Sequence, residues 1–165
     1  EMLLLADAAR SREEGYQAAA RALADGRALE KFRAIIEAQG GNPAVIDDPA
    51  LLPQAPVRRV LAAERDGYIG EMQVREIGEA AVALGAGRAS LESEIDPAVG
   101  FYMTAKPGQK VTRGEALVSV FARTEAKAEE ALVALRRAVP VTDAPFQARP
   151  LISHRVTSKG VEELT

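Results

Sequence analysis

The stretch that most constrains the fold runs from Ala105 to Ala122, with the sequence AKPGQKVTRGEALVSVFA. Its segment Lys106-Pro107-Gly108 predicts a turn, because proline fixes φ and glycine accepts the positive φ that a β-carbon resists. Arg113-Gly114-Glu115 predicts a second turn, and the apolar run from Leu117 to Phe121 is typical of a strand. Two turns this close predict a sharply bent β unit, in which the preceding segment, Val99 to Thr104, pairs with the apolar strand.

The bulk composition excludes several classes of function. The chain of 165 residues carries a net charge of -3 and shows no basic cluster, which argues against a nucleic-acid partner. Without cysteine it forms neither a disulfide nor a thiolate metal site, and the single histidine, His154, cannot build a histidine-rich site. No apolar run approaches the roughly 20 residues of a membrane span. We therefore expect a cytoplasmic protein with no metal, no cofactor and no membrane partner.

The first 41 residues predict a helical segment without a core of its own. The apolar run Met2 to Ala6 indicates a helix already under way at the start, and hence a piece of a longer protein. Ser11-Arg12-Glu13-Glu14 has the form of a capping box and predicts a helix from Arg12 to Asp25. A third helix is expected from Ala28 to Gln39. Its apolar positions at helical spacing are Leu29, Phe32, Ile35 and Ile36. Helices of this size bury too little surface to stand alone, so the segment is expected to pack on a larger body.

A proline-rich arm, residues 42–56, is predicted to connect this helical segment, 1–41, to a second domain. Each of its four prolines removes a backbone donor and favours extended geometry in the residue before it. Residues 57–157 are expected to form the second domain, with a frayed tail at 158–165. The expected strands outside the bent unit are Val57 to Ala63, Tyr68 to Gln73 and Phe146 to Val156. The expected helices are Arg75 to Leu84 and Glu125 to Ala138. The predicted fold class is therefore α+β, with antiparallel strands in the second domain.

The loop that follows the helix at Arg75 to Leu84 holds two features that could carry chemistry. Three carboxylates, Glu92, Glu94 and Asp96, could form an acid/base pair or a hard-cation site, but nothing else polar is placed to complete either one. We expect a solvated loop there. Gly85-Ala86-Gly87-Arg88 has the composition of a phosphate loop, yet it follows a helix C-terminus, whereas anion binding needs a helix N-terminus. A hinge or a helix cap is the better interpretation.

Two single residues need separate interpretations. His154 alternates with apolar Ile152 and Val156, which favours a structural or solvent-facing histidine over a catalytic one. The run VTRGEALVSVFARTEAKA resembles the first half of biotinyl and lipoyl carrier domains, in which Lys127 would be the acylated lysine. A carrier requires a strand directly after that lysine, and Ala128 to Leu135 is a helix former instead. Lys127 is therefore expected on a helix surface, and a stand-alone interaction or carrier module remains the alternative function.

Four stretches together resemble the C-terminal part of the pyrimidine nucleoside phosphorylases, a family that includes thymidine phosphorylase. They are ALEKFRAIIEAQGGNP (Ala28 to Pro43), DGYIGEMQVREIGEAAVALGAGR (Asp66 to Arg88), IDPAVGF (Ile95 to Phe101) and DAP (Asp143 to Pro145). Their order and spacing are similar to those of the family from near Glu1 to about residue 157.

This resemblance implies a parent enzyme, a glycosyltransferase of the pentosyltransferase type. Such an enzyme converts a pyrimidine (deoxy)nucleoside plus phosphate to free base and (deoxy)ribose 1-phosphate. The resemblance also implies an α/β-hammerhead domain at 57–157, a place for 1–41 in the parent's central α/β domain, and a homodimer formed through upstream helices. Phosphate is the co-substrate, and the nucleoside, whether thymidine, uridine or another, stays open.

The family's phosphate-binding and pyrimidine-binding motifs have no counterpart in this sequence, since they belong to a region upstream of Glu1. No catalytic and no phosphate-binding residue is therefore expected in this chain, which is expected to be structural and to be inactive in isolation. What the resemblance implies within it is a loop that faces the substrate cleft. The candidate residues of that loop are Gly85, Gly87 and Arg88.

Overall fold

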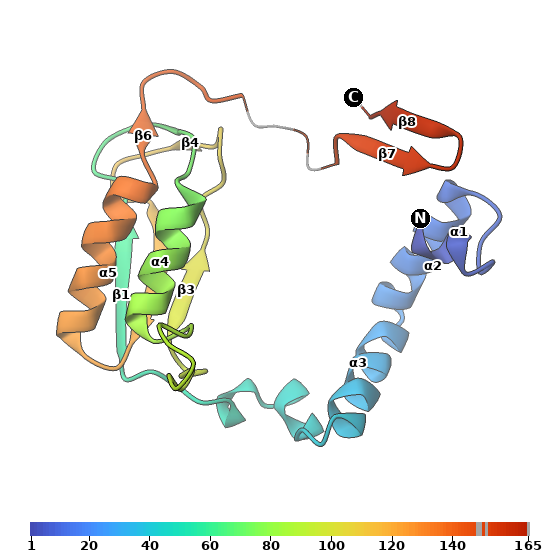
Figure 1. Ribbon diagram of the computed structural model, residues 1–165, viewed down its shortest axis with the longest axis horizontal. Helices are drawn as coiled ribbons and strands as arrows, with labels where there is room; N and C mark the ends of the chain where they lie inside the picture. Colours follow the sequence, from blue (N-terminus) through green and yellow to red (C-terminus); the bar gives the residue numbers. More distant parts are fainter. Residues whose placement is uncertain (148–149, 151, 165) are drawn as a thin grey trace. The chain divides into compact units, whose positions relative to one another are not determined.

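The structure is a computed structural model that describes residues 1–147, 150 and 152–164. The chain divides into two compact units, Glu1–Leu52 and Pro53–Thr165 (Figure 1). The first unit is helical and the second mixes helices with antiparallel sheets, so the predicted α+β class is confirmed. Among the described residues, no helix combines the length and the apolar composition that a membrane crossing requires.

The first unit contains short helices only. They are α1 (Met2–Leu5), α2 (Arg12–Ala24), α3 (Arg27–Ala38) and two 3-10 helices, η1 (Pro43–Ile46) and η2 (Pro49–Leu51). Ser11 caps α2 as predicted, because its Oγ accepts a hydrogen bond from the Glu14 amide at 3.1 Å. The reciprocal bond differs from the expected capping box, since the Glu14 carboxylate accepts from the Arg10 amide at 2.9 Å.

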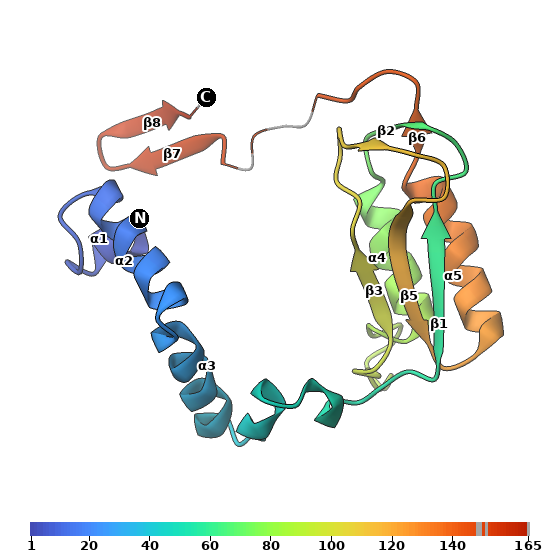
Figure 2. The same ribbon diagram turned by 180° about the vertical axis from the view of Figure 1, so that it is seen from behind.

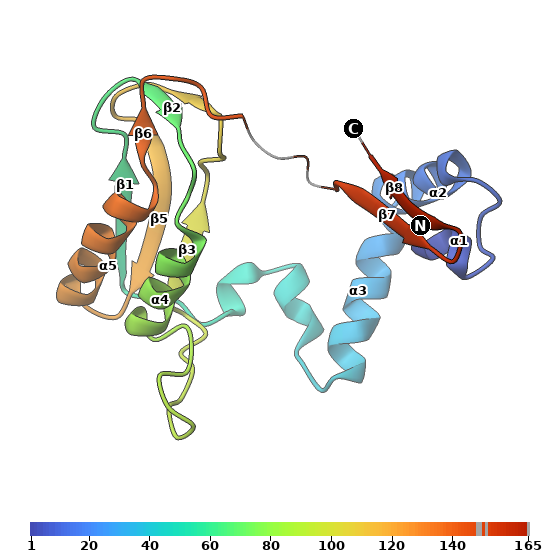
Figure 3. The same cartoon turned by 45° about the horizontal axis from the view of Figure 1, so that its top comes forward.

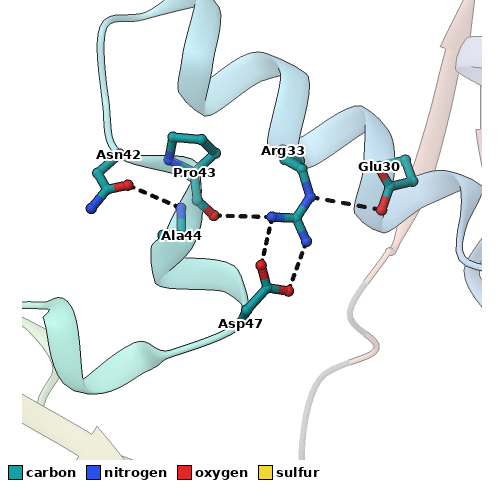
Figure 4. Close-up of polar contacts among 6 residues, drawn as sticks. All are labelled: Glu30, Arg33, Asn42, Pro43, Ala44 and Asp47. Carbon is teal, nitrogen blue, oxygen red and sulfur yellow. Dashed lines mark hydrogen bonds and ion pairs between the residues drawn. The ribbon is translucent and has the colours of Figure 1, made fainter.

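Arg33 joins α3 to the 3-10 helix η1 (Figure 4). Its Nη1 and Nη2 atoms donate to the two carboxylate oxygens of Asp47, each at 2.8 Å, and Nη1 also donates to the Pro43 carbonyl at 3.3 Å. The Asn42 side chain caps η1 by accepting from the Ala44 amide at 3.0 Å. Part of the proline-rich arm is therefore wound into capped turns and tied to the preceding helix.

The first unit buries almost none of its side chains. All of its residues are described, and Ala9 and Gly15 alone are buried. Large apolar side chains are instead open to solvent, with exposed fractions of 84% for Met2, 74% for Leu23 and 54% for Phe32. The expectation that these helices lack a core of their own is confirmed.

The second unit is built on a three-stranded antiparallel sheet in the order β1-β5-β3. The strands are β1 (Val57–Ala62), β3 (Gly100–Met103) and β5 (Ala116–Ala122). Two helices, α4 (Val74–Leu84) and α5 (Glu125–Ala138), lie side by side on one face of this sheet (Figures 1 and 2). The predicted pairing of the apolar strand with the segment before the bent unit is confirmed, with Phe101 opposite Val120.

A second small sheet closes one end of the core, in the order β4-β2-β6. Its strands are β2 (Gly67–Ile69), β4 (Lys110–Val111) and β6 (Val141–Thr142). Both predicted glycine turns around β4 adopt the left-handed region, with φ of 82° at Gly108 and 88° at Gly114. The largest fully buried side chains join the two sheets and α5 in one core. They are Ile69, Val111, Val118, Val120 and Leu135.

The strand predicted at Tyr68 to Gln73 is wrong in extent, because β2 ends at Ile69. Beyond that residue the Gly70 amide donates to the Pro140 carbonyl at 2.9 Å, and the Gln73 amide donates to the Ala138 carbonyl at the same distance. Both acceptors lie in the segment at the end of α5. After Ile69 the chain therefore leaves the β2–β6 ladder and follows this segment into α4.

The strand predicted at Phe146 to Val156 is also wrong, because strand structure begins only at β7 (His154–Thr157). Residues 148, 149 and 151 of that predicted strand lie outside the described residues. The frayed tail predicted at 158–165 is corrected as well. Residues of the tail form β8 (Gly160–Glu163), which pairs antiparallel with β7 in a hairpin (Figure 3).

Gly67→Ala is expected to destabilise the second unit, because β2 and β6 approach too closely at this position for a side chain. A β-carbon there would lie 2.6 Å from the Thr142 carbonyl oxygen and 2.8 Å from Val141 Cγ1. We expect the free energy of unfolding to fall by about 1–3 kcal/mol. The matched control is Gly78→Ala in the middle of α4, where a β-carbon meets nothing within 4 Å. It should gain roughly 0.5–1 kcal/mol. Denaturant titration measures both, and equal stabilities would contradict the prediction.

Candidate functional site

The loop from Gly85 to Asp96 leaves the end of α4 through two glycines. Gly85 has a φ of 112°, and its amide donates to the Val82 carbonyl at 3.0 Å, so the helix-cap interpretation of this glycine is confirmed. At Gly87 a β-carbon would lie 2.8 Å from Val82 Cγ2. The loop therefore passes close against α4. Gly85 permits the positive φ that ends the helix, and Gly87 leaves room for the Val82 side chain.

Asp96 closes the base of this loop. Its amide donates to the Gly85 carbonyl at 3.0 Å, and its carboxylate accepts from the Ala98 amide at 3.0 Å. The same carboxylate meets Arg123, at the end of β5, with 2.5 Å from Nε to Oδ2 and 2.8 Å from Nη2 to Oδ1. Arg123 Nη1 also donates to the Gln54 carbonyl at 3.3 Å. One guanidinium thus joins the loop, β5 and the segment that leads into β1, and we call this group of contacts the loop anchor.

The loop anchor also sets the charge state of its two members. Hydrogen bonds from Arg123, followed by the bond from the Ala98 amide, lower the pKa of the Asp96 carboxyl below its ordinary value. The Asp96 carboxylate in turn raises the pKa of Arg123. A lowered carboxyl pKa stabilises the folded state above the ordinary aspartate pKa, and that stabilisation is lost as the pH falls through the lowered value.

Arg88 lies on the exposed part of the loop. Among the residues that the structure describes, none pairs with its guanidinium. The loop continues into a turn in which the Ser90 amide donates to Ser93 Oγ at 3.0 Å, and Leu91 at the tip is 89% exposed. The three candidate residues, Gly85, Gly87 and Arg88, thus lie at the start of a loop whose other end is held by the loop anchor. The guanidinium of Arg88 is the exposed positive charge of this loop.

The three carboxylates noted in the sequence do not act as a group. Glu92 and Glu94 are exposed, whereas Asp96 is engaged by Arg123. Within the described residues, no set of three histidine, cysteine or acidic side chains is placed to hold a metal ion. In the local sequence Asp96 looks like Glu92 and Glu94. What distinguishes it is its ion pair with Arg123, 27 residues later, which the sequence around Asp96 does not indicate.

The other two candidates lie where they were expected. His154 is exposed on β7, with Nδ1 2.9 Å from Ser153 Oγ. Lys127 is in the first turn of α5, where its Nζ lies 3.0 Å from a Glu130 carboxylate oxygen. Because β5 runs directly into this helix, Lys127 is not at the tip of a hairpin. The structure therefore lacks the setting that a biotinyl or lipoyl lysine requires.

A small cavity of about 130 Å³ lies beside β1, and the sequence did not indicate it. Its lining includes the buried Leu61 and Leu117 together with Arg65 and Arg136. Both arginines are neutralised, since Arg136 pairs with Glu64 at 2.9 Å and Arg65 pairs with Asp143. The 85–96 loop, with its open arginine, remains the better candidate for contact with an anionic substrate.

Sequence comparison shows that most of the chain is similar to one group of enzymes. Residues 68–142 match the family model of the pyrimidine nucleoside phosphorylase C-terminal domain. The chain is 39% identical over 156 residues to a pyrimidine-nucleoside phosphorylase of Geobacillus stearothermophilus, covering 94% of this chain and 36% of that protein. It is 42% identical over 125 residues to one of Bacillus subtilis, covering 76% of this chain and 29% of that protein. A relative in Staphylococcus aureus is 34% identical over 159 residues, and the chain spans 36% of its length.

Proposed function

Because this chain belongs to the pyrimidine nucleoside phosphorylase family and carries its C-terminal domain, we propose that the whole protein is an enzyme of that type. The reaction is the exchange of a pyrimidine base for phosphate on a (deoxy)nucleoside, which makes the enzyme a pentosyltransferase. Its products are the free base and (deoxy)ribose 1-phosphate. The observation that carries this proposal is the 39% identity over 94% of the chain, which extends well beyond the 68–142 domain.

Within that enzyme, this chain acts as a structural support that presents one loop to the substrate cleft. Phosphorolysis depends on holding phosphate beneath the anomeric carbon and on stabilising the departing base. The chain spans about a third of the length of these relatives, so the remaining length is available to supply those contacts. The chain's own contribution is the loop of Gly85, Gly87 and Arg88, whose guanidinium can donate paired N–H bonds to phosphate oxygens.

The remaining properties of the enzyme follow from this assignment. Its partners are a pyrimidine nucleoside and phosphate, with no further cofactor, no nucleic acid and no membrane. The enzyme is a cytoplasmic homodimer formed through helices upstream of this chain, and the helices of residues 1–41 pack on its central α/β domain. The exposed apolar side chains of α1, α2 and α3 support that packing, since they lack cover within their own unit.

The whole protein is expected to release uracil from uridine or thymine from thymidine only when phosphate is present. The assay measures free base and pentose 1-phosphate across a phosphate titration, with inosine as the purine control. Equal molar amounts of base and pentose 1-phosphate would support phosphorolysis. Base release without phosphate would indicate a hydrolase, and a clear preference for inosine would place the enzyme outside the pyrimidine class. Either result would overturn the proposal.

A further inference from the structure

The position of the 85–96 loop depends on few contacts. The hydrogen bonds of its outer part are internal to the loop, as in the turn where the Ser93 amide donates to the Ser90 carbonyl at 3.2 Å. Its ties to the rest of the second unit are the glycine turn at the end of α4 and the loop anchor at Asp96. The direction in which the loop leaves the domain is therefore set at these two points.

Arg123 is well placed to fix the second of these points. It follows Ala122, which is fully buried in β5, and it precedes Thr124, which caps α5 by accepting from the Lys127 amide at 3.2 Å. The backbone on both sides of Arg123 is thus held by a core strand and a capped helix. Its planar fork spans both Asp96 oxygens, and a lysine would offer only a single point charge.

We propose that Arg123 is a positioning residue, which holds the base of the 85–96 loop through Asp96 and the Gln54 carbonyl and so sets where Arg88 stands when the whole enzyme binds phosphate. This inference rests on the proposed function. It assigns Arg123 an indirect role, because Arg123 acts on phosphate binding only by positioning Arg88. In this proposal the remaining length of the enzyme supplies the main phosphate contacts, Arg88 adds one contact from the loop, and Arg123 limits the positions that Arg88 can occupy. Loss of the anchor should therefore weaken phosphate binding more than it slows the chemical step.

A matched pair of variants in the whole protein tests this role. Arg123→Gln removes the guanidinium fork and its charge while keeping a polar, shorter side chain. The control is Arg59→Gln, because Arg59 also forms a half-exposed ion pair in the second unit, 2.6 Å from Glu125, without touching the loop. Arg123→Lys tests whether charge alone is enough. The single variant Asp96→Asn and the double variant Asp96→Asn with Arg123→Gln complete a double-mutant cycle.

Two readouts are measured on each variant. Hydrogen exchange reports the amides of Asp96 and Ala98, which the anchor holds, and steady-state kinetics reports the KM for phosphate and kcat separately. Arg123→Gln is expected to speed exchange at these two amides by about two- to fivefold, as for loss of a partly exposed charge pair. It is expected to raise the KM for phosphate by a similar factor with kcat nearly unchanged. Arg123→Lys should recover little of this loss, Arg59→Gln should change neither quantity, and the double variant should resemble the worse single variant.

Several results would overturn the proposal. Unchanged loop exchange in Arg123→Gln would show that the anchor does not hold the loop. Faster exchange with an unchanged KM for phosphate would show that the anchor is structural and does not position Arg88. Full recovery in Arg123→Lys would show that charge alone matters and the fork does not. If the unaltered protein is active and Arg123→Gln behaves like Arg59→Gln, this inference alone fails. If the unaltered protein shows no phosphorolysis, the proposed function fails and the positioning role fails with it.

Discussion

In the isolated chain, the amides of α2 and α3 are expected to exchange with solvent at least about 100-fold faster than those of β5 and α5. The two N-terminal helices have 13 and 12 residues, close to the length at which an isolated helix is marginal in water. They bury almost no apolar surface in their own unit, whereas β5 and α5 line a shared core that includes Val118, Val120 and Leu135. Opening of the first unit should therefore cost much less free energy than opening of the second.

The exposed apolar side chains of the first unit also favour association between chains, which would slow exchange. Burying one large apolar side chain is worth about 1.5–3 kcal/mol, so Met2, Leu23 and Phe32 together favour association between chains. The exchange measurement must therefore be made on a sample shown to be monomeric by sedimentation. Leu135→Ala should lower the protection of β5 and α5 alone, by about 2–5 kcal/mol, and Phe32→Ala should not. Equal, strong protection of both units in a confirmed monomer would show that the helices find cover within the chain.

Local signals predicted those parts of the fold whose hydrogen bonds are local. The helix at Glu125 to Ala138 was predicted to the residue, because Thr124 caps its start and its apolar side repeats at helical spacing. The two glycine turns of the bent unit were also predictable, since Gly108 and Gly114 meet the need for positive φ. The antiparallel pairing of β3 with β5 followed from the turns that separate them.

Elements whose partners lie far along the chain were predicted poorly. β2 ends early because its next amides bond to Pro140 and Ala138, about seventy residues away. The hairpin of β7 and β8 has a local signal in its turn. Gly160, with a φ of 129°, ends the turn Thr-Ser-Lys-Gly between two short strands. The candidate loop was implied by the family resemblance, and its glycines indicated only a hinge or a helix cap. Its anchor was not indicated, because nothing near Asp96 in the sequence points to Arg123.

The isolated chain is expected to show no phosphorolysis. Its described residues offer the open Arg88 on the 85–96 loop, a cavity of about 130 Å³ whose two arginines are already paired with acids, and a hollow of about 380 Å³ that the β7–β8 hairpin lines by itself. Catalysis also needs phosphate and base held together in a reactive arrangement, which can account for roughly 7–11 kcal/mol of the barrier. A chain without both contacts should fall below detectable turnover even with phosphate in excess.

The most direct test is to assay the whole protein and the isolated chain of 165 residues side by side, under the same phosphate and nucleoside concentrations. Release of uracil or thymine is followed, with the integrity of β5 and α5 in the isolated chain checked by hydrogen exchange. The whole protein should turn over at ordinary enzyme rates, on the order of 1–1,000 per second, while the isolated chain stays at the level of the blank. Phosphate-dependent base release by the isolated chain, at even about 1% of the rate of the whole protein, would contradict a purely supporting role for this part of the enzyme.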